Sequence, residues 1–290
     1  MKLSTVILPL QRWPQSQEKW VRAEELGFHA AYTYDHLSWG RLQDRPWFGA
    51  VPTLTAAALA TSSIRLGTLV TTPNFRHPVP LAKDLMSLDD ISSGRLIIGI
   101  GSGGLGSDDT VLGKEPWSAQ ERMDRFVNFA DLLDHLLRQP LTSEQGQFYS
   151  AFEARMLPGT LQQPRPPFCI AAAGKRGLDV VLRHAQAWVS VGRGADPDAS
   201  CYDTVSLQLR RLRDAFDVAN RDVNDIDRAL LDGLNDEKPL VSLDSFVDWA
   251  GRYQELGITE LVIHWPEPDS LYESDVSVFE AIATEGLSQL

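Results

Sequence analysis

Residues 64–103 read IRLGTLVTTPNFRHPVPLAKDLMSLDDISSGRLIIGIGSG, and this stretch decides the fold. Two short apolar runs, at 64–70 and 95–100, flank a longer segment at 79–91 that contains regularly spaced apolar residues. Short runs of β-branched residues and leucine are typical of buried strands, whereas the longer segment has helical length. A strand, a helix and a second strand in this order predict a parallel pair that is joined by a crossover helix.

The same alternation continues in both directions along the 290 residues. The predicted strands cover residues 3–10, 28–34, 64–70, 95–100, 168–172, 187–191, 226–231 and 259–264. Amphipathic segments of helical length follow each of these runs. Eight strand–helix units predict an α/β fold, and their number favours a closed (β/α)8 TIM barrel over an open sheet. We expect residues 1–290 to form a single barrel domain.

One segment interrupts the alternation between the fourth helix and the fifth strand. Residues 139–167 contain five prolines and two glycines, and the strand–helix rhythm resumes after them. We interpret this segment as an excursion from the barrel. Ser118 and Glu121 precede it and have the spacing of a capping box, in which each side chain satisfies a free N–H at a helix start.

Composition narrows the possible partners. The formal net charge of −12 repels phosphate backbones and anionic lipid, so neither nucleic acid nor a membrane is an expected partner. Cys169 and Cys201 lack metal-binding spacing, which predicts no metal site and no disulfide framework. The apolar run at 3–10 lacks a cleavage site, and no run has membrane-spanning length. We therefore expect a cytoplasmic protein.

The loops after the strands are where a barrel places its active site. The fourth strand runs into a loop, 101–106, that satisfies a G-x-G-x-x-G search. A dinucleotide fold places this motif after its first strand, so we favour a loop whose glycines let a flat ring approach the backbone, or a loop without a ligand. After the fifth strand, Lys175 and Arg176 open a helix. They are either two solvated cations or the partners of a phosphate at the helix N-terminus.

Histidines and tryptophans supply the remaining candidates in these loops. His36 follows Asp35 directly after the second strand, which makes it a candidate proton donor or acceptor, or else a surface residue beside a helix cap. His77 and His264 also lie in mouth loops, whereas His29, His135 and His184 occupy structural positions. Trp13, Trp39 and Trp265 are candidate walls for a ring-shaped pocket.

The assembled segments resemble the luciferase-like flavin and deazaflavin oxidoreductases, the bacterial luciferase-like superfamily. The matching segments are Ala31-Ala-Tyr-Thr-Tyr-Asp-His36, Ile64-Arg-Leu-Gly-Thr-Leu-Val-Thr71, Phe75-Arg-His-Pro78, Leu88-Asp89, Ser93-Gly-Arg-Leu-Ile-Ile-Gly-Ile-Gly-Ser-Gly103, Gln147-Phe-Tyr149 and Pro166-Pro-Phe-Cys-Ile-Ala-Ala-Ala-Gly174. The resemblance implies a TIM barrel that binds its cofactor at the mouth. It is densest between the third and fourth strands.

The resemblance also implies roles for individual residues. A non-proline cis peptide at Leu69–Val70, next to Thr71, would back the cofactor ring, and Ser102 and Gly103 would lie beside the ring and its ribityl chain. The segment Ala172-Ala173-Gly174, continued by Lys175 and Arg176, matches the phosphate-binding loop. His36, with Asp35 as its orienting partner, matches the pair beside the redox centre in members that use coenzyme F420. Gly104 departs from the family's sugar-phosphate dehydrogenases, which carry an acid there, so sugar-phosphate oxidation is in doubt.

Three functions follow as hypotheses. The first is an F420-dependent oxidoreductase that transfers a hydride between the deazaflavin and a small organic substrate while His36 moves the proton. The second is an FMN-dependent monooxygenase that uses oxygen and reduced flavin, which a separate flavin or F420 reductase would supply. The third is a flavin-binding protein without turnover. The resemblance also makes a homodimer an expectation, and the substrate itself cannot be read from the sequence.

Overall fold

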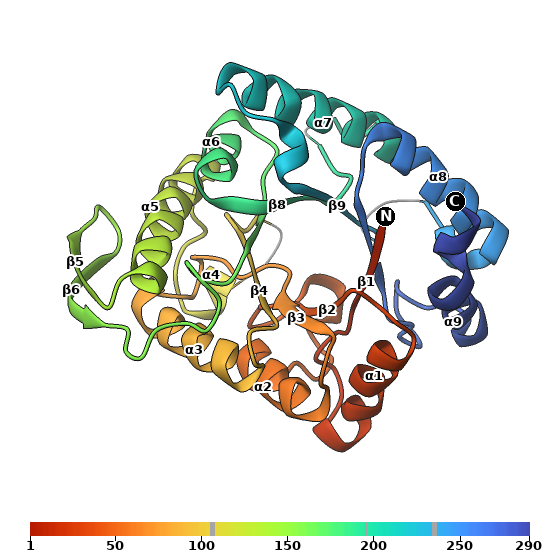
Figure 1. The fold of residues 1–290 in the computed structure, drawn as a ribbon, viewed down its shortest axis with the longest axis horizontal. Coiled ribbons are helices and arrows are strands. Elements are labelled where there is room, and N and C mark those ends of the chain that lie inside the picture. Colours follow the sequence, from red (N-terminus) through yellow and green to blue (C-terminus); the bar gives the residue numbers. More distant parts are fainter. Residues whose placement is uncertain (105–107, 195, 234–236) are drawn as a thin grey trace.

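Eight parallel strands form a closed barrel in this computed structural model, which describes residues 1–104, 108–194, 196–233 and 237–290 (Figure 1). Their order around the barrel is β1-β10-β9-β8-β7-β4-β3-β2. The strands are β1 (Lys2–Val6), β2 (Ala30–Thr33), β3 (Arg65–Thr68), β4 (Leu96–Gly101), β7 (Phe168–Ala171), β8 (Ala185–Ser190), β9 (Asp227–Leu231) and β10 (Glu260–His264). The predicted (β/α)8 barrel is confirmed, and every barrel strand overlaps a predicted run.

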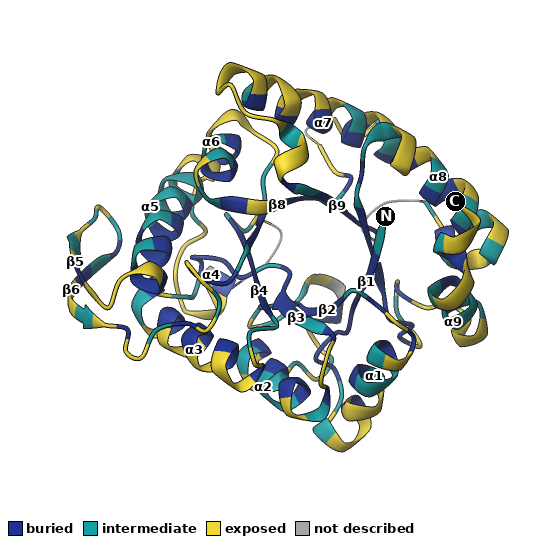
Figure 2. Ribbon diagram, in the orientation of Figure 1, coloured by how far each residue is buried: buried dark blue, intermediate teal, exposed yellow. Residues whose placement is uncertain are grey.

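Helices surround the barrel and follow each strand in turn (Figure 1). The α-helices are α1 (Trp13–Glu25), α2 (Ala50–Ala60), α3 (Pro78–Ile91), α4 (Asp108–Val111), α5 (Ala119–Arg138), α6 (Lys175–His184), α7 (Cys201–Val218), α8 (Leu243–Leu256) and α9 (Val276–Glu285). Short 3-10 turns occur at η1 (Gly40–Leu42), η2 (Val223–Asp225), η3 (Pro239–Val241) and η4 (Gly286–Gln289). The helices bury their inner faces and expose their outer faces, as amphipathic sequence patterns predict (Figure 2).

The buried apolar side chains form two layers. The outer layer lies between the strands and the helices and contains large residues such as Trp20, Phe129 and Trp188. The inner layer fills the barrel with alternate residues of the strands, including Val6, Tyr32, Ile97, Cys169, Val189 and Val262. Because the interior is packed, a ligand must bind above it, at the end where the strands finish.

Helix ends follow the predicted signals closely. Gly27 and Gly257 end α1 and α8 with positive φ angles of 81° and 104°, which glycine adopts without steric cost. Ser118 caps α5 by accepting a hydrogen bond from the Glu121 N–H at 3.1 Å. The capping box is only half formed, because the Glu121 carboxylate accepts from Arg125 one turn later instead of reaching back.

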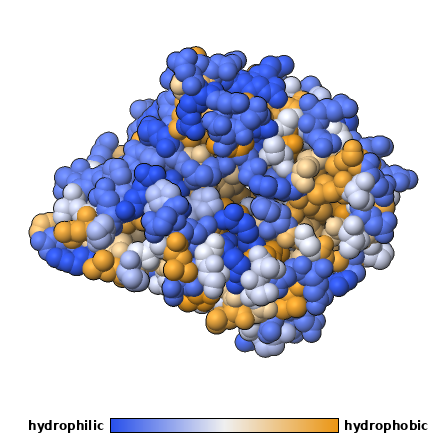
Figure 3. Space-filling model, viewed as in Figure 1, coloured by the Kyte–Doolittle hydropathy of each residue, from blue (hydrophilic) through white to orange (hydrophobic). Residues whose placement is uncertain are grey.

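The excursion between α5 and β7 contains an antiparallel hairpin that the sequence analysis did not predict. Its strands are β5 (Leu141–Gln145) and β6 (Ser150–Arg155), which lie outside α5 at one end of the molecule (Figure 1). Apolar side chains gather at this end of the surface (Figure 3). Arg165 lies where the excursion rejoins the barrel. Its guanidinium is 2.6 Å from Asp134 of α5 and also donates a hydrogen bond to the His184 carbonyl.

Candidate active site

The ends of β3 and β4 meet at the mouth of the barrel, where the resemblance places the cofactor ring. The Leu69–Val70 peptide bond is cis, so the non-proline cis bond expected at this position is confirmed. Thr71 then bridges to β4, since its N–H donates to the Gly99 carbonyl at 2.8 Å and its carbonyl accepts from the Gly101 N–H. The predicted residues of these two loops therefore form one continuous surface.

Glycines leave this surface without side chains. A Cβ added to Gly103 would lie 2.3 Å from Asn74 Nδ2, and the φ angle of Gly103 is +68°, so both space and conformation require glycine. Asn74 is buried, and its Oδ1 accepts no hydrogen bond from the described residues. A buried acceptor beside a bare loop fits a ligand that donates a hydrogen bond. Asn74 was not predicted as a site residue, although its loop follows a barrel strand.

The structure describes only part of the rest of the predicted glycine motif. Leu105 and Gly106, which complete the G-x-G-x-x-G pattern, lie outside the described residues. Ser102 is half-buried beside Gly103 on the surface after β4. The loop follows the fourth barrel strand, so the structure has the barrel topology and not that of a dinucleotide fold.

The loop after β7 presents a bare helix N-terminus to the solvent. Gly174 is the N-cap of α6 and offers no side chain, while Ala172 and Ala173 precede it. The Lys175 side chain is 90% exposed and 3.6 Å from Asp179, and Arg176 pairs with Asp124 of α5. Lys175 is therefore largely solvated and Arg176 is paired, and the backbone N–H groups of the first turn remain the main feature that attracts an anion.

His36 has a different partner from the one expected. Its Nδ1 lies 2.7 Å from Asp108 Oδ2, while Asp108 Oδ1 accepts from the Leu37 N–H at 2.7 Å. The Asp108 side chain is fully buried, which fixes both contacts. The expectation that Asp35 orients His36 is wrong, because Asp35 bonds elsewhere and Asp108 of α4 takes its place.

Asp35 instead ties the loop after β3 to the end of β2. Its carboxylate accepts from Thr71 Oγ1 at 2.8 Å and from Arg76 through two nitrogens at 3.1 and 2.7 Å. Paired hydrogen bonds between a guanidinium and a carboxylate fix orientation as well as distance. Asp35 is therefore a positioning residue for the loop that carries the cis peptide.

The hydrogen bond with Asp108 determines how His36 can act. A carboxylate accepts hydrogen bonds only, so Nδ1 of His36 carries a proton and donates it to Asp108. In the neutral imidazole Nε2 is then the free acceptor. Trp39 stacks on the ring with centroids 4.6 Å apart and limits its rotation. The arrangement holds a proton acceptor in one orientation at the mouth.

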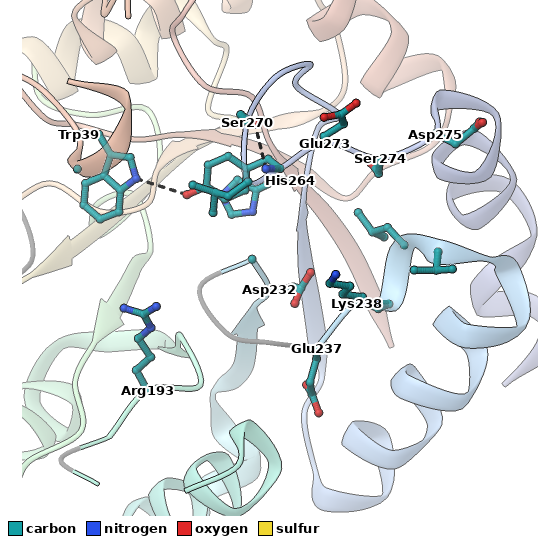
Figure 4. Close-up of a pocket in the computed structure, with 17 residues that line it drawn as sticks. Trp39, Arg193, Asp232, Glu237, Lys238, His264, Ser270, Glu273, Ser274 and Asp275 are labelled. Atoms are coloured by element: carbon teal, nitrogen blue, oxygen red, sulfur yellow. Dashed lines mark hydrogen bonds between the residues drawn. The ribbon is translucent and has the colours of Figure 1, made fainter. Parts of the chain in front are cut away.

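A cavity of about 810 Å³ opens beside Trp39 (Figure 4). Its walls come from the loops after β8, β9 and β10, through Arg193, Asp232 and His264. The described residues that line it include none of the predicted cofactor or catalytic residues. Trp39 is the shared wall, because it stacks on His36 and also lines the cavity.

Aromatic side chains connect the two sides of the mouth. Trp39 Nε1 donates to the Tyr272 hydroxyl at 3.4 Å, and Tyr272 stacks on His264 with centroids 3.8 Å apart. Tyr34 lies 2.9 Å from His264 Nε2 through its hydroxyl. Burial lowers the pKa of His264 to about 3, so this imidazole is neutral at physiological pH. The sequence predicts that His264 lies near the mouth, but it does not predict that the side chain is fully buried.

The other candidate side chains have structural surroundings. His77 caps α3 by accepting from the Val79 N–H, and His184 pairs with Asp131. Trp265 packs against Phe279 of α9 and is absent from the cavity that Trp39 lines. Burial raises the pKa of Cys201 to about 12, which argues against a nucleophilic thiolate.

None of the helices among the described residues has both the length and the apolar character that a membrane span requires. No three histidine, cysteine, aspartate or glutamate side chains in the same part of the chain are grouped to hold a metal ion.

Comparisons with known proteins agree with this geometry. The F420-dependent glucose-6-phosphate dehydrogenase of Microbacterium testaceum is 29% identical over 215 residues, which are 71% of this chain and 60% of that protein. The chain thus matches about three fifths of the length of that relative. An F420-dependent secondary alcohol dehydrogenase solved with an F420–acetone adduct has a TM-score of 0.78 at 17% identity, covering 98% of this chain and 99% of that one.

A monooxygenase structure from Streptomyces bottropensis shares the same fold, with a TM-score of 0.77 at 22% identity and 99% coverage of both chains. The family model described as luciferase-like monooxygenase matches residues 4–234. That match includes the strands that carry the cis peptide, the glycine loop and His36. The chain belongs to the luciferase-like monooxygenase family.

Proposed function

We propose that this protein is an F420-dependent oxidoreductase that transfers a hydride between the deazaflavin and a small organic substrate. The observation that carries the proposal is the His36–Asp108 pair at the mouth, next to the loop with the cis peptide. Hydride transfer to or from an alcohol requires a group that takes up or supplies one proton, and this pair provides it. Relatives whose names state F420 dependence support the same cofactor.

The surface between β3, β4 and β7 fits such a cofactor. Leu69, Val70 and Thr71 would lie behind the ring, with Ser102 and Gly103 along its edge. Asn74 Oδ1 would accept a hydrogen bond there, and the N–H groups at Ala172, Ala173 and Gly174 would hold a phosphate. When bound, the deazaflavin accepts or supplies a hydride, which is two electrons and one proton.

His36 accounts for the second proton. As an alcohol carbon gives up its hydride, the hydroxyl proton passes to Nε2 of His36, and the substrate becomes a carbonyl compound. In the reverse direction the same nitrogen returns the proton to the carbonyl oxygen. Asp108 stabilises the imidazolium that forms, because its buried carboxylate accepts from Nδ1 throughout. Trp39 keeps the ring in place during both steps.

An FMN-dependent monooxygenase is the second candidate. The similarity in fold to a solved monooxygenase favours it, and a mouth lined by glycines admits either ring. This function would need reduced flavin from a separate reductase. Sugar-phosphate oxidation is less well supported, because Gly104 occupies the acidic position of those relatives.

A parallel binding titration distinguishes the candidates. Apoprotein is titrated with F420, FMN and NADPH, and we expect F420 to bind at least about tenfold more tightly than either alternative. Gly103→Ala should weaken F420 binding by about tenfold or more, because its Cβ would collide with Asn74. Gly104→Ala is the matched control, since a Cβ there has nothing within 4 Å. Tighter binding of FMN would overturn the proposal.

A further inference from the structure

The excursion between α5 and β7 contacts the mouth of the barrel through one side chain. Its hairpin lies outside α5, and the turn that joins β5 to β6 carries Tyr149, which is buried (Figure 1). The Tyr149 hydroxyl donates to the Pro73 carbonyl at 3.0 Å, across 76 positions of the sequence. Pro73 lies in the loop after β3, between the cis peptide and Asn74. A segment outside the barrel therefore touches the loop that we propose to receive the cofactor ring.

Tyr149 contacts this loop at two points. Besides the hydrogen bond to Pro73, its ring lies edge-on against His77, with centroids 5.4 Å apart and planes at 86°. His77 ends the loop, since its side chain caps α3. Inside the loop, the Asn74 N–H donates to Thr72 Oγ1 at 3.3 Å, which is long for a hydrogen bond. The contacts with Tyr149 therefore hold the loop from outside, near both of its ends.

The surroundings of Tyr149 fix the direction of its hydroxyl. Phe129 of α5 packs edge-on against the ring, with centroids 6.0 Å apart and planes at 74°. Burial raises the pKa of Tyr149 and outweighs the opposite effect of Arg125, so the hydroxyl keeps its proton and donates. The bond to Pro73 is buried, and a buried carbonyl that loses its donor is unfavourable. The contact is therefore specific to tyrosine, because phenylalanine has no donor at this point.

Helix α5 holds the turn from which Tyr149 extends. Asn128 Oδ1 accepts from the N–H groups of Phe148 and Tyr149, both at 2.9 Å. Gly146 leaves room for this amide, because a Cβ there would lie 2.4 Å from Asn128 Nδ2 and 2.3 Å from the Tyr149 carbonyl oxygen. The guanidinium of Arg125 lies over the Phe148 ring, 4.6 Å from its centroid. The turn is thus attached to a helix of the barrel as well as to the hairpin.

The residue after Pro73 depends on this arrangement. Asn74 packs against Gly103, and its Oδ1 has no hydrogen-bond partner among the described residues. The Pro73 carbonyl and the Asn74 Cα lie in one peptide plane, so a rotation of that carbonyl would also move Asn74. A loop that is already held in its bound conformation loses less entropy when its ligand arrives. Support from Tyr149 should therefore favour binding of the ring.

We propose that Tyr149 is a positioning residue for the cofactor, which holds the loop after β3 in the conformation that receives the ring. This inference rests on the proposed function and deepens it, because it gives the excursion a part in cofactor binding. Tyr149 acts through Pro73 and Asn74 and does not touch the ring itself. The excursion thus supports the cofactor site from outside the barrel.

Tyr149→Phe tests this role because it removes the hydroxyl and keeps the ring. Titration of the apoprotein with F420 should give a Kd about fivefold higher than that of the native protein, the loss expected when one hydrogen bond no longer holds the loop. Hydrogen exchange of the backbone N–H groups of residues 71–77, measured without cofactor, should become faster.

Tyr32→Phe is the matched control. It also removes a buried hydroxyl, which donates to Glu260 at the end of the barrel opposite the mouth. Both variants can lose stability, but Tyr32→Phe should change the Kd for F420 by less than about twofold. A comparison of Kd with Tm in the two variants therefore separates positioning of the loop from a general effect on the fold.

Asn128→Ala covers the case in which Tyr149→Phe does not fold, since it releases the turn without a change at Tyr149. It should raise the Kd for F420 by about threefold or more, but by less than about twofold when introduced into the Tyr149→Phe variant, because both changes act on the same loop. Ser143→Ala removes a hydrogen bond to the Glu153 N–H elsewhere in the hairpin and should leave the Kd unchanged.

Three results would each overturn the inference: a native Kd in Tyr149→Phe, equal changes of Kd in Tyr149→Phe and Tyr32→Phe, or unchanged hydrogen exchange of residues 71–77. Failure of the native protein to bind F420, together with binding of FMN, would contradict the proposed function alone. The same titrations with FMN would then decide the role of Tyr149, and the exchange measurement needs no cofactor.

Discussion

At the scale of single residues, the pair that we propose to be catalytic consists of groups that are far apart in the sequence. His36 follows β2, and its partner Asp108 lies 72 positions later, in α4. Asp35 is adjacent to His36 but bonds to Thr71 and Arg76. Successive side chains of an extended segment point in opposite directions, so neighbours in sequence rarely contact the same group. The dipeptide therefore suggested the wrong aspartate as the partner of His36.

Asp108→Asn tests the pair directly. An asparagine amide can donate to Nδ1 of His36, which would leave the imidazole proton on Nε2 and remove the proton acceptor. We expect kcat for any alcohol that is turned over to fall by about 100-fold or more, while the Kd for F420 changes less than about threefold.

The matched control for this variant is Asp44→Asn, an exposed aspartate in the loop after β2. It should leave kcat unchanged. A native rate in Asp108→Asn, at unchanged cofactor affinity, would remove Asp108 from the mechanism and leave its contact with His36 as a structural one.

Part of the site could be predicted at this scale, and part could not. The cis peptide bond at Leu69–Val70 was predicted from the family resemblance, and the residues that match at this position lie in a single segment of the sequence. Asn74 and most of the cavity side chains, though not Trp39 and His264, were missed because their significance depends on burial and on unpaired atoms, which appear only after folding. His264 ends a strand in the sequence, but its neutral state follows from the packing of Tyr34 and Tyr272 around it.

At the scale of elements, the sequence periodicity was sufficient to predict the strands of the barrel. It was not sufficient to predict the hairpin within the excursion. The strand at 226–231 contained two charges, which weakened the prediction, yet β9 forms there. Arg228 donates to the Gly257 and Val223 carbonyls, and Asp227 pairs with Lys2 of β1. The two charged side chains of β9 therefore bind to groups at the ends of neighbouring elements. The hairpin of β5 and β6 was missed because its five- and six-residue strands alternate polar and apolar residues only weakly.

The contact between α5 and α6 gives a prediction about pH. His184 of α6 lies 2.6 Å from Asp131 and 3.7 Å from Asp134, both in α5. Burial lowers the pKa of His184, but the hydrogen bonds to the two carboxylates outweigh it and raise the pKa above 6.5. The folded state therefore holds this proton more tightly than the unfolded state does. Its stabilising effect is complete below pH 6.5 and is lost as the pH rises through the folded pKa.

We expect the Tm to fall from this cause between pH 6 and pH 9. His184→Gln should flatten that part of the profile, as measured by calorimetry. His135→Gln, at a more exposed histidine of α5 that pairs with Glu144, is the control. An unchanged slope in His184→Gln would show that other groups cause the pH dependence.

At the scale of the whole molecule, the barrel interior is polar at one end and aromatic at the other. Glu260, at the start of β10, is 3% exposed and accepts from Ser4 Oγ at 2.6 Å and from the Tyr32 hydroxyl at 3.3 Å. The mouth lies at the opposite ends of the same strands. No local pattern predicts this carboxyl, because its surroundings come from β1, β2 and β10 together.

The protonation of Glu260 should therefore influence the stability of the closed barrel. Burial raises the pKa of this carboxyl, and nearby Asp227 adds to the increase, while Ser4, Lys2 and Tyr32 oppose it. An acid whose folded pKa is raised stabilises the protein most below its unfolded pKa of about 4.5, and this stability is lost as the pH rises through the folded pKa. The pH range in which Glu260 changes the stability begins about two pH units below the range in which His184 does. The two effects on stability can therefore be separated.

Glu260→Gln removes the titration and keeps an oxygen that can accept from Ser4 and Tyr32. Below about pH 4.5 the amide should be less stable than the protonated acid, by about 1–3 kcal/mol, because it buries two N–H donors where the acid buries one O–H. As the pH rises through the raised pKa of Glu260, ionisation destabilises the native protein but not the variant, so the difference in Tm between them should shrink or reverse. Subtracting the two profiles cancels the other titrating groups, provided that they lie far from β10. Glu273→Gln, at an exposed position on the rim of the cavity, should give a constant difference. A constant difference for Glu260→Gln as well would mean that the buried carboxyl keeps one protonation state throughout this range.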